Sequence, residues 1–205
     1  MILASASPRR RELLGRLGLE LDIRAADIDE TRLAGEHPCD LVKRLAHEKA
    51  HAVRSAYGLG DDGYLLAADT IVWMDDAALG KPADDEDARA MLRMLSGRTH
   101  EVSTGVCILS GDGEGLHEAN FVETTDVSFY ELTDAQIDAY VRSGECSDKA
   151  GSYAIQGTGS LLVRSITGDY DNVVGLPVAR VVRELAGMRG SASGLLERVL
   201  EGRNA

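Results

Sequence analysis

The sequence predicts a globular protein of the α/β class, because short apolar segments suited to buried strands alternate with amphipathic segments suited to helices. Its 205 residues are enough for one sizeable core. A hydrophobic content of 44% with 27% charged residues is typical of a folded, water-soluble domain. No apolar run approaches the roughly 20 residues that a membrane-spanning helix needs, so we expect no membrane partner.

The first half of the chain begins with an apolar segment, residues 2–4, that predicts a short buried strand. Ser7 is a good N-cap and Pro8 suits a first helical turn, so a helix is expected to begin there. The elements expected after it are, in order, a helix over 40–54, a strand over 64–74, a turn at Asp75-Asp76 and a return strand over 77–81.

In the second half, Thr133 and Gln136 have the spacing of a capping box and predict the start of a helix. The other expected elements are a helix over 87–95, a strand over 100–109, a second strand that ends near residue 130, a buried strand over 161–163 and a helix after Pro177.

The strand expected over 64–74 carries a carboxylate at a position where strands disfavour one. Asp69 and Thr70 interrupt an apolar run, and a buried charge without a partner is costly. Protein cations or a bound metal must therefore compensate Asp69. From the residues alone, Asp69 is either an ion-paired strand residue or a catalytic group.

Three arginines, Arg9 to Arg11, occupy the first turn of the first predicted helix. The helix dipole disfavours cations there by roughly 0.3–1 kcal/mol each. A phosphate group at this position would reverse the effect, because it accepts hydrogen bonds from the free N–H groups and the guanidinium groups. The alternative is three solvated arginines among many acidic residues.

Two lysines are candidates to compensate Asp69. Lys49 shares the apolar stripe of Val42 and Ala46, so it either extends to the rim of the core or points into a cleft. A hairpin centred between the two turn aspartates places Lys81 opposite Thr70 and next to Asp69.

Two loops add polar groups. An acidic loop contains Glu30, and a glycine-rich loop over 143–157 contains Gln156, a pattern suited to close approach of the backbone to a ligand. The five histidines are not expected to form a zinc site.

The net charge of −12 argues against non-specific binding to nucleic acid or to an anionic membrane. A small anionic ligand held by a local basic cluster is compatible with it. Three scattered cysteines without a C-x-x-C pair favour a reducing, cytoplasmic location.

Taken together, these segments resemble the Maf family of nucleotide pyrophosphatases, and the likeness runs from residue 2 to about residue 186. The matching segments are A-S-A-S-P-R-R-R-E-L-L (4–14), D-E-T (29–31), R-L-A-H-E-K-A (44–50), A-D-T (68–70), G-K-P (80–82), L-S-G (95–97), the loop over 143–157 and N-V-V-G-L-P (172–177). We therefore expect a Maf-like domain over 1–186 and a C-terminal extension over 187–205.

The resemblance implies a fold and a reaction. The fold is α/β, with a mixed, twisted sheet, flanking helices and two lobes around a central cleft, similar to Maf and inosine triphosphatase proteins. The reaction is metal-dependent hydrolysis of nucleoside triphosphates to a monophosphate and pyrophosphate, with Mg²⁺ or Mn²⁺ as cofactor and commonly a homodimer. The residues at 68–70 and 153–157 look like the branch that acts on dTTP and UTP, with a house-cleaning role on related nucleotides.

The resemblance also assigns roles to residues. It gives Asp69 as the general base, and it ties Arg10, Thr70 and Gln156 to substrate choice. The surrounding catalytic and phosphate-binding set is Ser7, Arg9, Glu30, Lys49 and Lys81. Asp69 and Glu30 offer the hard oxygen ligands that Mg²⁺ and Mn²⁺ prefer.

Two alternatives are kept open by the sequence. One is the related branch that prefers 7-methyl-GTP, which typically carries a different residue where Thr70 stands. The other is a non-catalytic nucleotide-binding regulator of cell division, because Maf proteins have been linked to septum inhibition.

Overall fold

The structure is a computed structural model that describes every residue except 61–62, 112–114, 189–196, 198–199 and 202–205. In the described residues, seven strands form one sheet in the order β2-β1-β3-β5-β6-β7, with β4 paired to β3. The strands are β1 (Ile2–Leu3), β2 (Asp22–Ile23), β3 (Tyr64–Met74), β4 (Ala77–Leu79), β5 (Thr99–Gly111), β6 (Leu116–Phe129) and β7 (Val163–Thr167). β1 runs parallel to β2 and β3 whereas the other pairs are antiparallel, so the sheet is mixed, as predicted.

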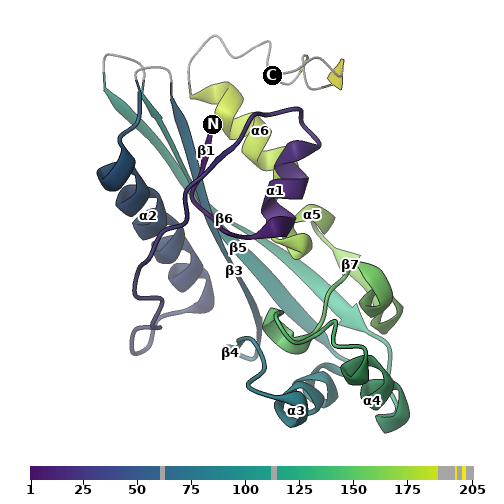
Figure 1. The fold of residues 1–205 in the computed structure, drawn as a ribbon. Helices are drawn as coiled ribbons and strands as arrows, with labels where there is room; N and C mark the ends of the chain where they lie inside the picture. The colour runs from purple at the N-terminus through teal and green to yellow at the C-terminus, as the bar shows by residue number, and fades with distance from the viewer. Residues whose placement is uncertain (61–62, 112–114, 189–196, 198–199, 202–205) are drawn as a thin grey trace.

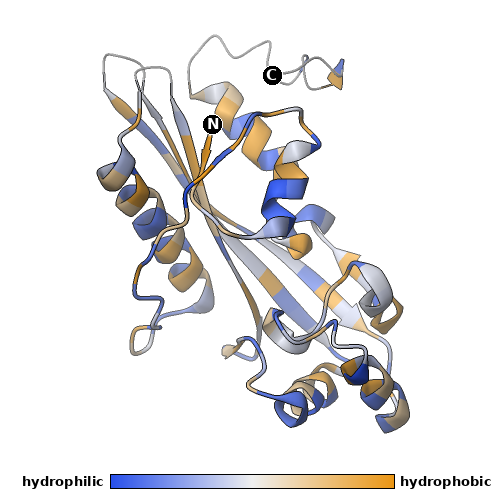
Figure 2. Cartoon of the chain, viewed as in Figure 1, coloured by the Kyte–Doolittle hydropathy of each residue, from blue (hydrophilic) through white to orange (hydrophobic). Residues whose placement is uncertain are grey.

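The helices divide between the two faces of this sheet. They are α1 (Pro8–Gly15), α2 (Pro38–Tyr57), α3 (Asp85–Leu95), α4 (Asp134–Arg142), α5 (Tyr170–Val174) and α6 (Val178–Gly187), with short 3-10 helices η1 (Ala150–Ser152) and η2 (Gly157–Leu162). Helix α2 packs on one face, and the buried residues of α1, α3, α4, α5 and α6 belong to a core on the other face. Figure 2 shows that α2 carries both hydrophobic and hydrophilic residues, as expected of a helix with one side on a sheet.

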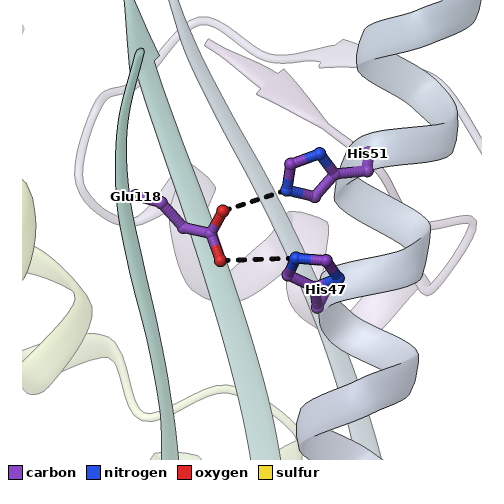
Figure 3. A group of neighbouring side chains, drawn as sticks. All are labelled: His47, His51 and Glu118. Atoms are coloured by element: carbon purple, nitrogen blue, oxygen red, sulfur yellow. Dashed lines mark hydrogen bonds and ion pairs between the residues drawn. The ribbon is translucent and has the colours of Figure 1, made fainter.

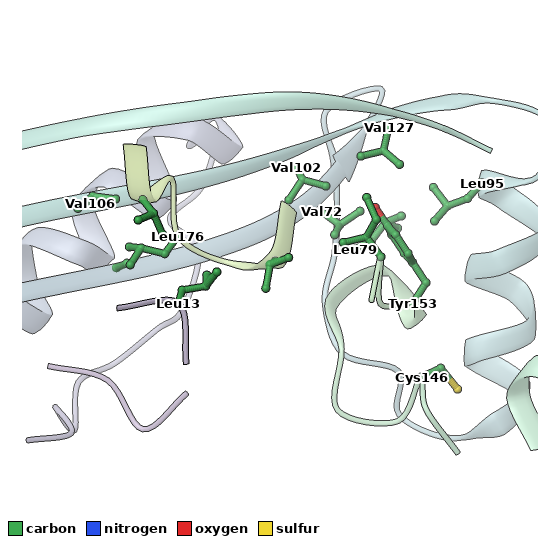
Figure 4. Packing of buried hydrophobic residues seen from close by; sticks show 14 of the residues in the cluster. Leu13, Val72, Leu79, Leu95, Val102, Val106, Val127, Cys146, Tyr153 and Leu176 are labelled. Atoms are coloured by element: carbon green, nitrogen blue, oxygen red, sulfur yellow. The ribbon is translucent and has the colours of Figure 1, made fainter. Parts of the chain in front are cut away.

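The helices on the second face form two groups. Figure 1 shows α1 and α6 near one end of the long sheet, and α3 and α4 near the other end. One core cluster nevertheless continues through both groups, from Leu13 and Leu176 to Leu95, with Val72 and Val102 between them (Figure 4). No helix in the described part of the chain has the length and apolar character needed to cross a membrane.

Gly105 determines how closely α2 approaches the sheet. It lies on β5 directly opposite Asp69 of β3. A Cβ atom at Gly105 would lie only 2.1 Å from the carbonyl oxygen of Val42 in α2. The missing side chain therefore lets the helix backbone contact the strand, which brings Lys49 of the same helix to β3.

Most of the predicted helices and strands are confirmed, although their first and last residues differ from the predicted ones. The β3–β4 hairpin has the predicted register, with Val72 opposite Leu79, and its turn places Asp75 and Asp76 at φ of 52° and 63°. The pairing ends at Leu79, so the predicted placement of Lys81 opposite Thr70 in a return strand is wrong. The predicted buried strand over 161–163 is wrong, because η2 extends to Leu162 and the side chain of Leu161 is exposed. The predicted extension over 187–205 lies mostly outside the described residues.

Substituting Gly105→Ala tests this packing. The added methyl group overlaps the backbone of α2, so we expect the free energy of unfolding to fall by about 1–3 kcal/mol or more. Urea denaturation measures this change. Gly15→Ala in α1 is the matched control, because a Cβ there meets nothing within 4 Å and should cost no stability. Equal stability of the two variants would contradict the close approach of α2.

Candidate active site

The candidate site lies where the ladder on one side of β3 is interrupted. On this side, β1 pairs with β3 as far as Leu66, and β4 pairs with it only from Val72 onward. Residues 67–71 pair with β5 on the other side, and in the described residues no strand pairs with them at the interruption. Side chains alternate across a strand, so Asp69 faces α2 whereas Thr70 faces α1 and α5.

A cleft of about 760 Å³ opens at this interruption. It is lined by segments that lie far apart in the sequence, including the start of α1, α2, β3 and the loop before η2. All nine residues that the sequence predicts for the site line this cleft: Ser7, Arg9, Arg10, Glu30, Lys49, Asp69, Thr70, Lys81 and Gln156. The fold therefore gathers them in one place, while the role of each stays a prediction.

The cleft is positively charged although the chain is acidic. Its lining contains five cationic residues (Arg9, Arg10, Lys49, Lys81 and Lys149) and three anionic ones (Glu30, Asp69 and Asp148). Three of the four lysines in the chain are in this lining. A local excess of positive charge in a protein of net charge −12 is the arrangement that attracts a small anion.

Lys49 compensates the carboxylate of Asp69. Of the two positions that the sequence allows for Lys49, the rim of the core or a cleft, the structure shows the cleft. The Nζ of Lys49 lies 2.6 Å from Oδ1 of Asp69 and 2.7 Å from Oε1 of Glu30. The side chains of Lys49 and Asp69 are only 11% and 18% exposed, whereas that of Glu30 is 60% exposed. The Lys49–Asp69 pair is thus a fixed part of the cleft, and Glu30 joins it from the solvent side.

Asp69 and Glu30 also fit a hard divalent cation. One oxygen of each carboxylate lies within 2.7 Å of the Lys49 ammonium, so both already face a positive charge. Two carboxylates suit Mg²⁺ because this ion keeps several waters and takes further oxygens from substrate phosphates. Mn²⁺ accepts the same oxygen ligands.

Arg10 is fixed on the other face of β3 by three acceptors. Its Nη2 donates to Oγ1 of Thr70 at 2.9 Å, its Nη1 to Oγ of Ser5 at 3.1 Å, and its Nε to the carbonyl oxygen of Gly175 at 2.9 Å. Burial lowers the pKa of Arg10, and the nearby Asp69 carboxylate opposes this shift. The guanidinium is thereby held in one orientation at the wall of the cleft.

A buried polar network supports Thr70 from behind. The Thr70 hydroxyl lies 2.9 Å from Oγ1 of Thr104, which donates to the carbonyl oxygen of Asn172. The Asn172 amide in turn donates to the carbonyl oxygen of Val102 at 2.9 Å and to Oγ1 of Thr125 at 3.0 Å. These bonds tie α5 to β5 and β6, so Thr70 cannot move independently of the sheet.

The other arginines and lysines of the site differ in how firmly they are held. Ser7 caps α1 as predicted, and it turns Arg9 and Arg10 into the cleft while Arg11 stays exposed outside the lining. Arg9 lies 3.7 Å from Asp148. In the part of the chain that the structure describes, the exposed Lys81 ammonium has no ion-pair or hydrogen-bond partner.

The loop that presents Gln156 is built around Glu145. The Glu145 carboxylate accepts hydrogen bonds from the backbone N–H groups of Thr158 and Gly159, each at 3.1 Å. Burial raises the pKa of Glu145, but the hydrogen bonds from Thr158 and Gly159 outweigh this and leave it lowered. Gln156 lines the cleft, and its amide makes no hydrogen bond among the described residues.

Sequence reasoning did not find the Ser5 hydroxyl or the Gly175 carbonyl as anchors of Arg10. Both lie inside segments that the family resemblance covers, but nothing in their residue types indicates a contact with an arginine. Glu145 was likewise not singled out. The sequence pattern that could have indicated Glu145 is a carboxylate between the glycines of a loop. This pattern is also common in loops where the carboxylate does not hold the backbone.

Comparison with known proteins shows which family the chain resembles over most of its length. A family profile described as Maf-like protein matches residues 1–188. A dTTP/UTP pyrophosphatase of Anaeromyxobacter dehalogenans is 54% identical over 179 residues, which are 87% of this chain and 89% of that protein. Proteins of the same name from Bacillus cereus and Bacillus anthracis are each 50% identical over 185 residues, 90% of this chain and 93% of theirs. The profile match spans every residue that lines the cleft.

Proposed function

The chain belongs to the Maf family, and on that premise we propose that it hydrolyses dTTP and UTP to the nucleoside monophosphate and pyrophosphate. The observation that carries the proposal is the excess of cationic side chains in the cleft of an acidic protein. A triphosphate is the kind of anion that such a cleft attracts. The names of relatives at 50–54% identity support the choice of dTTP and UTP.

In the proposed complex, the cations of the cleft neutralise the triphosphate. Phosphoryl transfer depends mainly on positioning and on stabilising the charge that develops on the phosphate oxygens. Lys81 has no partner among the described residues, and Arg9 pairs only loosely with Asp148, so both are available to phosphate. Arg10 uses three of its five N–H donors on the protein, and it presents the others in a fixed direction.

Asp69 is the proposed general base. Water attacks the α-phosphorus, the bond from this atom to the oxygen bridging the α and β phosphates breaks, and pyrophosphate leaves. Asp69 accepts the proton of the attacking water, and Lys49 keeps the carboxylate in position. When bound by Asp69 and Glu30, Mg²⁺ or Mn²⁺ would supply charge neutralisation and lower the pKa of coordinated water.

Gln156 is proposed to recognise the pyrimidine ring. Its amide offers both a donor and an acceptor, and uracil and thymine present an N–H group flanked by carbonyl oxygens. Thr70 and Arg10 line the same cleft and are proposed to contribute to the choice of base. This assignment rests on the lining of the cleft and on the family resemblance.

The proposed location, oligomeric state and partners rest on the cysteines, the family resemblance and the net charge rather than on the geometry of the cleft. We propose a cytoplasmic enzyme, because the three cysteines are free in the structure, two of them buried. We propose a homodimer from the family resemblance, which analytical ultracentrifugation tests directly. The net charge of −12 argues against nucleic acid or an anionic membrane as a partner.

The function is tested by measuring pyrophosphate release from dTTP, UTP, CTP and 7-methyl-GTP, with Mg²⁺ or Mn²⁺ present. We expect dTTP and UTP to be hydrolysed with the highest kcat/KM. Preference for 7-methyl-GTP would place the protein in the other branch of the family. Tight nucleotide binding without turnover of any substrate would support a regulatory role in cell division and contradict the proposal.

Substituting Asp69→Asn removes the proposed base while keeping the shape of the side chain. General acid–base catalysis contributes about 10²–10⁴-fold, so we expect kcat for dTTP to fall by that amount with the fold preserved by circular dichroism. Asp126→Asn, an exposed β6 residue outside the cleft lining, is the matched control and should leave kcat unchanged. Near-normal turnover by the Asp69→Asn variant would rule out this role.

Substituting Arg10→Lys tests the three-point anchor. One ammonium cannot replace three guanidinium contacts that point in different directions. We expect kcat/KM for dTTP and UTP to fall by about tenfold or more, and the free energy of unfolding to fall by about 1–3 kcal/mol. Arg11→Lys, one residue further along α1 and exposed, should change neither quantity. If both variants behave alike, the anchor has no role in binding or stability.

A further inference from the structure

A second group of side chains suited to a cation lies on the flank of α2 that faces β6. His47 and His51 of α2 and Glu118 of β6 point toward one another (Figure 3). Nε2 of His51 is 3.0 Å from one oxygen of Glu118, and Nε2 of His47 is 3.6 Å from the other. The three side chains are 44%, 34% and 31% exposed, in the order His47, His51 and Glu118. Solvent therefore reaches the group.

The spacing of the two histidines is one that metal sites use. Residues 47–51 read His-Glu-Lys-Ala-His, and two histidines four apart lie one helical turn from each other on one face. The prediction that the histidines form no zinc site did not take this spacing into account. The glutamate inside this motif is not placed as a catalytic base, because Glu48 accepts hydrogen bonds from Arg44.

The rings of both histidines are directed at one carboxylate, and Nε2 of His51 is within hydrogen-bonding distance of it. The ring centroids of His47 and His51 are 4.2 Å apart, and both rings present Nε2 to one carboxylate. Two protonated imidazoles at this distance would repel each other, and one is enough to neutralise Glu118. A divalent cation would replace the hydrogen bond between His51 and Glu118, and would use the Nε2 lone pair of each neutral ring together with the carboxylate.

The distances need only a small adjustment to hold an ion. One ligand atom from each of the three side chains lies within 4.8 Å of the others. Around tetrahedral zinc, with bonds of about 2.0–2.1 Å, ligand atoms lie roughly 3.3 Å apart. Partly exposed side chains on a helix and a strand can close this difference by small changes in their torsion angles. Two imidazoles and a carboxylate suit Zn²⁺, whereas Mg²⁺ prefers oxygen ligands alone.

We propose that His47, His51 and Glu118 bind one Zn²⁺ ion at a site separate from the nucleotide cleft. Lys49 lies between the two histidines in sequence but faces Asp69, because residues two apart on a helix point to nearly opposite sides. The ion would link α2 to β6 through residues that are not part of the cleft lining. The proposal does not depend on the proposed pyrophosphatase activity.

Isothermal titration of the full chain with Zn²⁺, in an excess of Mg²⁺ that competes for oxygen-only sites, tests this site. We expect one Zn²⁺ per chain, and a loss of affinity of at least about a hundredfold in His51→Gln and Glu118→Gln. His117→Gln is the matched control, because His117 precedes Glu118 on β6 and alternates to the opposite face. Asp69→Asn is the second control. Both controls should bind Zn²⁺ as the unmodified protein does.

Thermal unfolding gives an independent readout. Zn²⁺ at about a hundred times its Kd should raise the Tm by about 5 °C or more in the unmodified protein and both controls, and by much less in His51→Gln. Circular dichroism establishes that each variant is folded. The proposal is overturned if no Zn²⁺ binds, if His117→Gln loses as much affinity as His51→Gln, or if Asp69→Asn loses the ion while His51→Gln keeps it.

Discussion

The fold depends on neutralising one carboxylate in the middle of a sheet. Asp69 sits on β3 with its side chain 18% exposed, and the Lys49 ammonium at 2.6 Å is its direct partner. This contact requires α2 to lie against the sheet, which Gly105 permits by having no side chain opposite Asp69. Removing the lysine would leave a mostly buried charge unpaired, which is strongly destabilising. Stability and the proposed chemistry therefore depend on the same contact.

Strand alternation separates two tasks between neighbouring residues. Asp69 faces α2 and joins the carboxylate and lysine that are proposed to handle the attacking water. Thr70 faces the other side, where it accepts a hydrogen bond from Arg10 and continues into the buried network of Asn172. A shift of the β3 register by one residue would exchange these surroundings. The long pairing of β3 with β5 protects against such a shift.

Local chemistry explains what the sequence predicted and what it missed. The capping box at Thr133, the hairpin register at Val72 and the inward stripe that carries Lys49 depend on nearby residues, and all three are confirmed. The contacts of Arg10 with Gly175 join residues 165 positions apart, so no local pattern reveals them. The prediction that Leu161 is buried is wrong for a different reason. Its local apolar run predicts a buried strand, but the residue lies in the 3-10 helix η2 and its side chain is exposed.

The interruption beside residues 67–71 of β3 also bears on edge-to-edge aggregation through added strands. Unpaired backbone groups along a strand edge are a template on which another chain can add a strand. Here the interruption lies between β1 and β4, and Asp69, Thr70 and Ile71 line a charged cleft. An extended segment of a second molecule would have to enter past the surrounding lysines and arginines. The opening proposed to admit a nucleotide thus surrounds this part of β3 with charged side chains, which disfavour the addition of a strand.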